Sequence, residues 1–160
     1  MRNIFFVLPA ALVGIMMASA AIADPIQTIL GKFQPASTTA SAYTGVLEIT
    51  PTEVRGTLGQ VYQTVGFGHV QGMVKSAEDG PTFGDMLGVD PETSVTLRRI
   101  KSGIVCPSVP NGGLCDDEPA PYLAYVMVGD GLRLAAFKGE LPAGPSGRRA
   151  DFCRTYNYIR

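Results

Sequence analysis

Residues 122–138 read YLAYVMVGDGLRLAAFK, two apolar runs on either side of Gly129-Asp130-Gly131. An Asp-Gly pair between apolar runs is a strong short-range signal for a β-hairpin. With Asp130-Gly131 as a two-residue turn, Met127 would pair with Leu134 on one face of the hairpin. Both faces are then mostly apolar, which predicts two strands in the middle of a sheet rather than at its edge.

Period-two alternation of apolar and polar residues recurs on both sides of this hairpin, as expected for half-buried strands. In the stretch 95–105 the inward set shifts phase between Leu97 and Ile100, which predicts a β-bulge across Arg98-Arg99. The other segments with this pattern are residues 43–50, 54–58, 61–67, 70–75 and 152–159.

About seven or eight short strands separated by turn signals, with little helix, predict an all-β fold. The alternatives are a small antiparallel β-barrel of lipocalin-like size and a β-sandwich. We favour the barrel, because glycines recur in the early strands and suit strong coiling, and because the final strand could close on the first.

The chain divides into three parts. Residues 1–23 read as a secretory signal peptide, with Arg2 before an apolar run and small residues at Ala21 and Ala23. Residues 24–42 predict a short N-terminal helix, which begins at Asp24-Pro25 and has apolar residues at helical spacing, followed by a flexible, uncharged linker. Residues 43–160 form a single β domain.

Charge and hydropathy narrow the functional classes. Without Arg2, 12 Lys and Arg residues face 14 Asp and Glu residues, a net charge of −2. That balance argues against nucleic-acid binding, which rests on a basic surface. The apolar run of the leader is shorter than the roughly 20 residues that a spanning helix needs, so we expect no stable membrane insertion after cleavage. The expected location is periplasmic or secreted.

Three cysteines in an exported chain leave one outside any single disulfide. Cys106 and Cys115 flank a loop rich in Pro and Gly, and their closeness in sequence favours a Cys106–Cys115 bridge. The rival is Cys106–Cys153, which would join two strands and close a much longer loop. In either case we expect a structural role, because small exported domains supplement their cores with disulfides.

No set of residues predicts catalysis or metal binding. His69 is the single histidine, and the chain has no Gly-x-Ser-x-Gly motif for a nucleophile. No group of ligands has the spacing of a zinc site, and the acidic run 116–118 lacks the alternating oxygen ligands of a calcium loop. We therefore expect a protein without enzymatic activity, metal or cofactor.

The remaining candidate is a binding surface. Asp116, Asp117 and Glu118 lie in the Cys-containing loop close to Tyr122, and a rigid acidic loop suits contact with a basic envelope or secreted protein, in an inhibitor-like or adaptor role. The alternative is a carrier that holds a small apolar ligand in the barrel. The residues that could line such a cavity, or simply pack a core, are Tyr43, Val65, Phe67, Met127 and Leu134.

Overall fold

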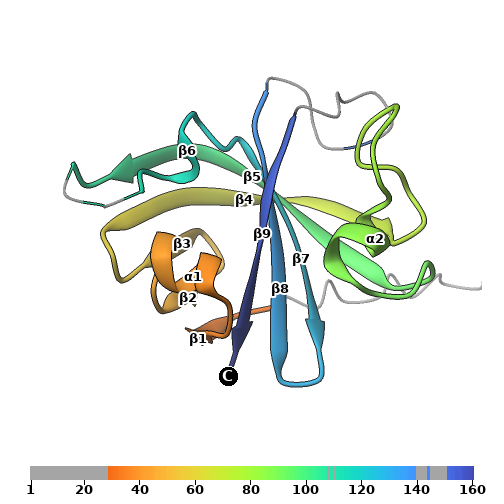
Figure 1. The fold of residues 1–160 in the computed structure, drawn as a ribbon, viewed down its shortest axis with the longest axis horizontal. Helices are drawn as coiled ribbons and strands as arrows, with labels where there is room; N and C mark the ends of the chain where they lie inside the picture. Colours follow the sequence, from red (N-terminus) through yellow and green to blue (C-terminus); the bar gives the residue numbers. More distant parts are fainter. Residues whose placement is uncertain (1–28, 108, 110, 140–143, 145–150) are drawn as a thin grey trace, which may run out of the picture.

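The computed structural model describes residues 29–107, 109, 111–139, 144 and 151–160, and it forms a closed antiparallel β-barrel (Figure 1). Eight strands make the barrel wall, in the order β1-β2-β3-β4-β5-β7-β8-β9. Their bounds are β1 Gly31–Pro35, β2 Leu47–Ile49, β3 Glu53–Gly56, β4 Gln60–Gln71, β5 Ser94–Val105, β7 Tyr122–Val128, β8 Gly131–Phe137 and β9 Phe152–Ile159. The prediction of an all-β fold is confirmed, and of the two architectures considered it is the barrel that forms.

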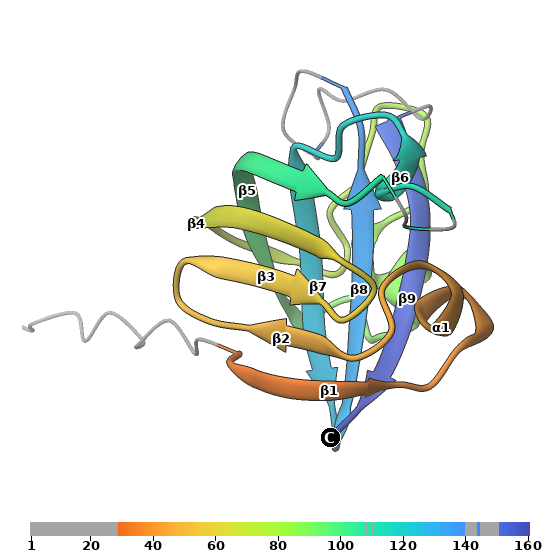
Figure 2. The same cartoon turned by 90° about the vertical axis from the view of Figure 1, so that its left-hand side faces the viewer.

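The last strand closes the barrel on the first. β9 pairs with β1 through Gln34↔Ile159 and Pro35↔Tyr158, whereas its ladder with β8 covers seven residue pairs. The strand β6 (Leu114–Asp117) is not part of the wall, and it lies against β8 and β9 at the end of the barrel away from β1 (Figure 2).

The hairpin of β7 and β8 forms as predicted, but its turn lies one residue earlier. Val128 pairs with Gly131, so the two turn residues are Gly129 and Asp130. Gly129 has φ +58° and Asp130 does not have a positive φ, which is the pattern of a type II′ turn with glycine in its first position. The predicted pairs are wrong by two residues, yet each side chain keeps its predicted face because side chains alternate with a period of two.

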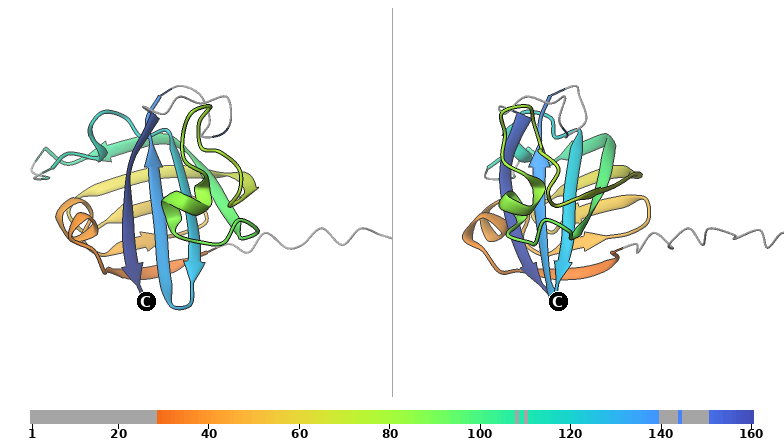
Figure 3. Two further views of the ribbon diagram at one scale, coloured as in Figure 1. Left: turned by 45° about the vertical axis from the view of Figure 1, so that its right-hand side comes forward. Right: turned by 90° about the vertical axis from the view of Figure 1, so that its right-hand side faces the viewer.

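Both faces of this hairpin are buried, as predicted. One face points into the barrel, where Leu123, Tyr125 and Leu134 join the interior cluster. The other face carries Ala124 and Ala135 and is covered by the helix α2 (Phe83–Leu87), which lies against β7 and β8 (Figure 3). A capping box begins α2, with the Thr82 and Asp85 side chains each bonded to the other residue's backbone N–H. No helix in the described part of the chain is long and apolar enough to cross a membrane.

The predicted inward set of β5 is wrong in its first half, whereas Ile100 packs against the interior cluster as predicted. Val95 and Leu97 belong to the outer cluster under α2, while Arg98 points to the interior side and is 3 % exposed. The ladder with β4 shifts register twice: it skips Lys101 on β5, and it skips Phe67 on β4 opposite Leu97 and Arg98. The extra residue of β5 itself is therefore Lys101 and does not lie across Arg98-Arg99. The guanidinium of Arg98 is tolerated inside because it donates to the carbonyl oxygens of the β2–β3 turn: Thr50 O at 2.8 Å and Pro51 O.

The N-terminal prediction is also wrong where the structure describes it. Residues 31–35 form β1 instead of continuing a helix, and the helix α1 (Thr38–Tyr43) lies within the predicted linker. Phe33 is fully buried in the barrel interior, so tertiary packing outweighs a helix signal that Gly31 already weakens. Ser37 caps α1 by accepting a hydrogen bond from Ala40 N. The signal peptide of residues 1–23 lies outside the described residues.

Candidate functional site

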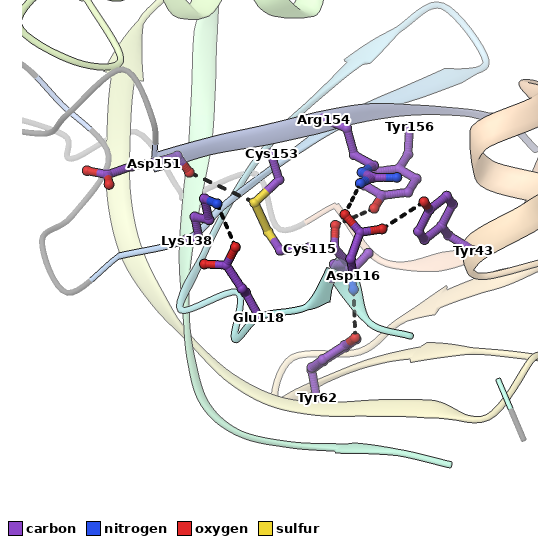
Figure 4. The surroundings of a disulfide bond; sticks show 11 residues. Tyr43, Tyr62, Cys115, Asp116, Glu118, Lys138, Asp151, Cys153, Arg154 and Tyr156 are labelled. Atoms are coloured by element: carbon purple, nitrogen blue, oxygen red, sulfur yellow. Dashed lines mark hydrogen bonds and ion pairs between the residues drawn. A yellow bond between two sulfur atoms is a disulfide. The ribbon is translucent and has the colours of Figure 1, made fainter. Parts of the chain in front are cut away.

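One end of the barrel is closed by the described residues 106, 107, 109 and 111–121, which we call the cap loop and which contain β6. Leu114 and Cys115 are 1 % and 3 % exposed and belong to the interior cluster. The backbone of Leu114 is held by two interior tyrosines: its N–H donates to the Tyr62 hydroxyl at 3.2 Å, and its carbonyl accepts from the Tyr156 hydroxyl (Figure 4). The cap loop therefore plugs the barrel instead of passing over it.

A disulfide between Cys115 and Cys153 fastens the cap loop to β9. Both predicted pairings are therefore wrong, since each of them used Cys106. Cys106 follows β5, is exposed and is not part of the disulfide, whereas Cys115 is turned into the interior and meets β9. Closeness in sequence favoured a bond between Cys106 and Cys115. In the structure Cys115 instead faces the interior beside β9, whereas Cys106 is exposed.

Two of the three carboxylates that were predicted to contact a partner form ion pairs within the molecule. Asp116 forms an ion pair with Arg154 and accepts a hydrogen bond from the Tyr43 hydroxyl at 2.8 Å. Arg154 also lies 4.2 Å from the centre of the Tyr43 ring, a cation–π contact. Glu118 pairs with Lys138 at 2.7 Å. These contacts fix the cap loop to α1, β8 and β9 and neutralise two of its charges (Figure 4).

Asp117 differs from its two neighbours. It is exposed, and among the described residues it forms no ion pair. The backbone of Asp116 beside it has φ +58°, a left-handed conformation that Asp tolerates better than most residues. The tight turn in β6 is closed by a hydrogen bond from Gly113 N to Asp116 O at 2.7 Å. The geometry thus presents the Asp117 carboxylate to solvent on a fixed backbone.

A groove with a volume of about 790 Å³ lies between the cap loop and the second half of β5. One wall is formed by β5 residues 100–103 and 105 and by Cys106 and Pro107, and the other by cap-loop residues 111–114 and 116–121. Tyr62 also contributes to the lining. All three predicted acidic residues line this groove, so the structure brings them together in one site.

Tyr122 is not part of that site. It is 5 % exposed, it belongs to the outer cluster, and its ring packs edge-on against Phe67 with ring centres 5.7 Å apart. Sequence adjacency to the acidic run suggested a shared surface, but the first residue of β7 points to the other side of the sheet. Sequence reasoning also missed the β5 wall of the groove. The available signal was a strand segment, residues 101–105, that stays exposed although it contains the apolar pair Ile104 and Val105; of the two, Val105 lines the groove.

The interior of the barrel is filled by side chains. Of the residues considered for a carrier cavity, Leu134 belongs to the interior cluster, and Tyr43 and Met127 are partly buried and pack against it. Val65 and Phe67 are instead on the outside, 39 % and 46 % exposed. Burial raises the pKa of four interior tyrosine hydroxyls above the ordinary value, namely those of Tyr62, Tyr125, Tyr156 and Tyr158.

His69 lies on β4, is exposed, and has its Nδ1 atom 3.4 Å from the Thr96 hydroxyl. Within the described residues no group of three or more His, Cys, Asp or Glu side chains is arranged to hold a metal ion. Comparisons with protein-family models, with curated proteins and with solved structures find no match for this chain.

Proposed function

We propose that this protein is an exported, non-enzymatic binding protein that contacts another envelope or secreted protein through the groove between β5 and the cap loop. The observation that carries the proposal is the groove itself, about 790 Å³ in volume and bounded by a disulfide-linked loop. Walls that are fixed before binding lose little conformational entropy on complex formation, which favours affinity.

The proposal prefers a protein partner over a small apolar ligand because of where the open space lies. The interior, where a barrel carrier holds its ligand, is packed with tyrosine, phenylalanine and leucine side chains. The groove is open to solvent and lined by both polar and apolar groups, including the carboxylates of the acidic run. Such a mixed surface is typical of protein contacts.

Electrostatic attraction should contribute less to partner binding than the presence of three adjacent carboxylates suggests. Asp116 and Glu118 are neutralised by Arg154 and Lys138, so the preference for a basic partner rests mainly on Asp117. A single exposed carboxylate at a binding site affects partner choice and association rate more than total affinity.

Site-specific photo-crosslinking tests the proposal. A photoreactive amino acid placed at Ser102, on the β5 wall, should crosslink one discrete partner in cells, whereas the same residue at the exposed position Glu92, remote from the groove, should not. Equal crosslinking patterns from the two positions would argue against a groove-specific partner.

The carrier alternative has its own readout. Native mass spectrometry of protein purified without detergent or reductant should give the mass of the processed chain beginning at Asp24, with no added small molecule. A co-purified apolar molecule that leaves on denaturation would replace the protein partner with a ligand, and an unprocessed leader would remove export from the proposal.

A further inference from the structure

We infer that the groove binds its partner by strand addition: an extended segment of the partner pairs with the open edge of β5 and places a basic side chain beside Asp117. This inference rests on the proposed function and specifies how the groove works. It follows from the ladder pattern of β5, from the bulge at Lys101 and from the charges at the two ends of the groove.

In the described part of the chain, the second half of β5 pairs with a neighbouring strand on one side only. Its ladder with β7 covers Thr96 to Arg99, and the bond from Ile100 N to Pro121 O at 2.7 Å is the last backbone hydrogen bond along that edge among the described residues. On the other side β5 stays paired with β4 as far as Val105. Among the described residues, no backbone hydrogen bond joins residues 101–105 to the cap loop. The groove therefore occupies the place where the next strand of the sheet would run.

The backbone groups that face this space can be identified from the alternation of an antiparallel ladder. Cys106 N donates to Gly59 O at 3.2 Å, so Cys106 faces β4, and Ile104 and Ser102, two and four residues earlier, face β4 as well. The intervening residues Gly103 and Val105 then direct their N–H and C=O groups into the groove.

The bulge explains why this phase differs from that of the first half of the strand. Ile100 directs its N–H toward β7, and an unbroken strand would keep the even-numbered residues on that side. The extra residue at Lys101 reverses the order. The side-chain faces reverse as well: after the bulge the odd-numbered Gly103 lies against the Tyr62 ring, whereas the even-numbered Ile104 is 72 % exposed and points outward.

The dimensions fit a short extended segment. Five residues of strand, 101–105, span roughly 16 Å at the usual rise per residue, which gives an added strand of comparable length room to pair. The groove volume of about 790 Å³ is large enough for several side chains of such a segment. Strand addition of this kind draws affinity from the main chain and specificity from the side-chain surroundings.

Charge indicates what the segment carries. A side chain on Gly112 would approach Asp117 Oδ1 at 3.1 Å, and one on Gly113 would approach Val105 Cγ2 at 3.3 Å, so Asp117 lies toward the Val105 end of the groove. Lys101 lies at the other end of the edge and lines the same groove. Asp117 is the acidic lining residue without an ion pair in the described part of the chain, which assigns the basic side chain of the segment to the Val105 end.

The test uses synthetic hexapeptides of alternating Thr and Val with blocked ends, in a pool with one Lys and a matched pool with one Glu. Fluorescence anisotropy should show binding about tenfold tighter for the Lys pool. The best peptide is then made in two forms, one N-methylated at its odd-numbered residues and one at its even-numbered residues. One form should lose binding and the other should keep it, because only alternate N–H groups of the peptide face β5. Amide exchange should slow at Gly103 and Val105 and stay unchanged at Ser102 and Ile104.

Two protein variants complete the test. Val105→Pro removes an N–H that faces the groove and should abolish binding, whereas Val105→Thr keeps the N–H and should retain it. Asp117→Lys should reverse the preference from the Lys pool to the Glu pool, whereas Asp79→Lys, the same charge change at an exposed residue away from the groove, should not.

The outcomes separate this inference from the proposed function. Peptide binding at the groove with equal sensitivity to both N-methylation phases would overturn strand addition and leave the protein-binding proposal standing. Failure of all peptides, together with the absence of groove-specific crosslinks in cells, would overturn both. A concentration-dependent dimer with slowed exchange at Gly103 and Val105 would make a second copy the occupant and overturn the assignment to a partner segment.

Discussion

Leu114 shows how a loop can enter a barrel without leaving unpaired backbone groups. It has no neighbouring wall strand to pair with, and it is 1 % exposed. A buried N–H or C=O without a partner costs free energy comparable to a lost hydrogen bond. Here the Tyr62 hydroxyl accepts from its N–H and the Tyr156 hydroxyl donates to its carbonyl, so side chains supply what a ladder would have supplied.

Tyr156→Phe should therefore destabilise the protein by about 1 to 3 kcal/mol, because it leaves the Leu114 carbonyl buried without a donor. Urea unfolding measures the change in free energy. Tyr122→Phe is the matched control, since Tyr122 is also buried and its hydroxyl forms no hydrogen bond with the described residues. Equal losses in the two variants would mean that the bond to Leu114 contributes nothing particular to stability.

At the scale of elements, the cap loop is held by one covalent link and several polar contacts. The Cys115–Cys153 disulfide spans 38 residues, and in the chain-entropy model a loop of that length contributes about 4 kcal/mol by restricting the unfolded chain. It also joins β6 to β9, an element that closes the barrel.

Reduction should thus lower the free energy of unfolding by about 4 kcal/mol, measured by urea unfolding with and without reductant. The double variant Cys115→Ser/Cys153→Ser should show the same loss and no further response to reductant. Peptide binding in the groove should weaken in parallel, because the wall carrying Asp117 is no longer tied to β9. A reduced protein as stable as the oxidised one would contradict this role.

The β7–β8 turn gives a second prediction at this scale. Gly129 has φ +58°, and a side chain built on it would meet no atom within 4 Å, so any cost of substitution comes from backbone conformation. Gly129→Ala should destabilise by about 1 kcal/mol, because a side chain is unfavourable at the positive φ of this position. Asp130→Ala, at the neighbouring turn position, should have little effect in the same thermal unfolding assay.

The elements also show which features can be predicted from sequence. Alternation in residues 122–138 was enough to predict the hairpin and its two buried faces, because a period of two survives an error of two residues in register. It was not enough for β5, where outward Val95 and Leu97 are as buried as interior residues, since α2 covers them. A rule that equates apolar with inward fails wherever both sides of a strand are covered.

Long-range pairing set the other limit. The Cys115–Cys153 bond, the strand character of residues 31–35 and the ion pairs of Asp116 and Glu118 all depend on which distant segments become neighbours. Local propensity contains no such information, and each of these features was predicted wrongly or not at all. The acidic groove wall was found because its residues are adjacent in sequence, and the β5 wall was missed because it lies elsewhere in the chain.

For the molecule as a whole, the interior tyrosines make the free energy of unfolding depend on pH in the alkaline range. Their hydroxyls are buried, and burial raises the pKa of each above the ordinary value of 10.0. Below pH 10 both folded and unfolded chains keep these protons, and the stability is complete. Above it the unfolded chain loses protons that the folded chain retains, which favours unfolding.

Stability should consequently fall above about pH 10, by about 1.4 kcal/mol per pH unit for each tyrosine that remains protonated in the fold. Urea unfolding at a series of alkaline pH values measures the slope, and tyrosinate absorbance reports ionisation directly. Tyr158→Phe should reduce the slope by one residue's share, although it also loses the hydrogen bond to Thr44. Interior tyrosines that ionise near pH 10 without unfolding would contradict the expectation.

The barrel's ladders differ in length, and the difference has a consequence for motion. β1 and β9 are joined by two residue pairs, the shortest ladder of the wall, while β7 and β8 share seven. Thermal opening should start where the fewest bonds must break, so hydrogen exchange should be fastest along the line between the first and last strands. When the β1–β9 ladder opens, the disulfide still holds β9 to the cap loop. We therefore expect the two strands to separate locally and to pair again in the same register.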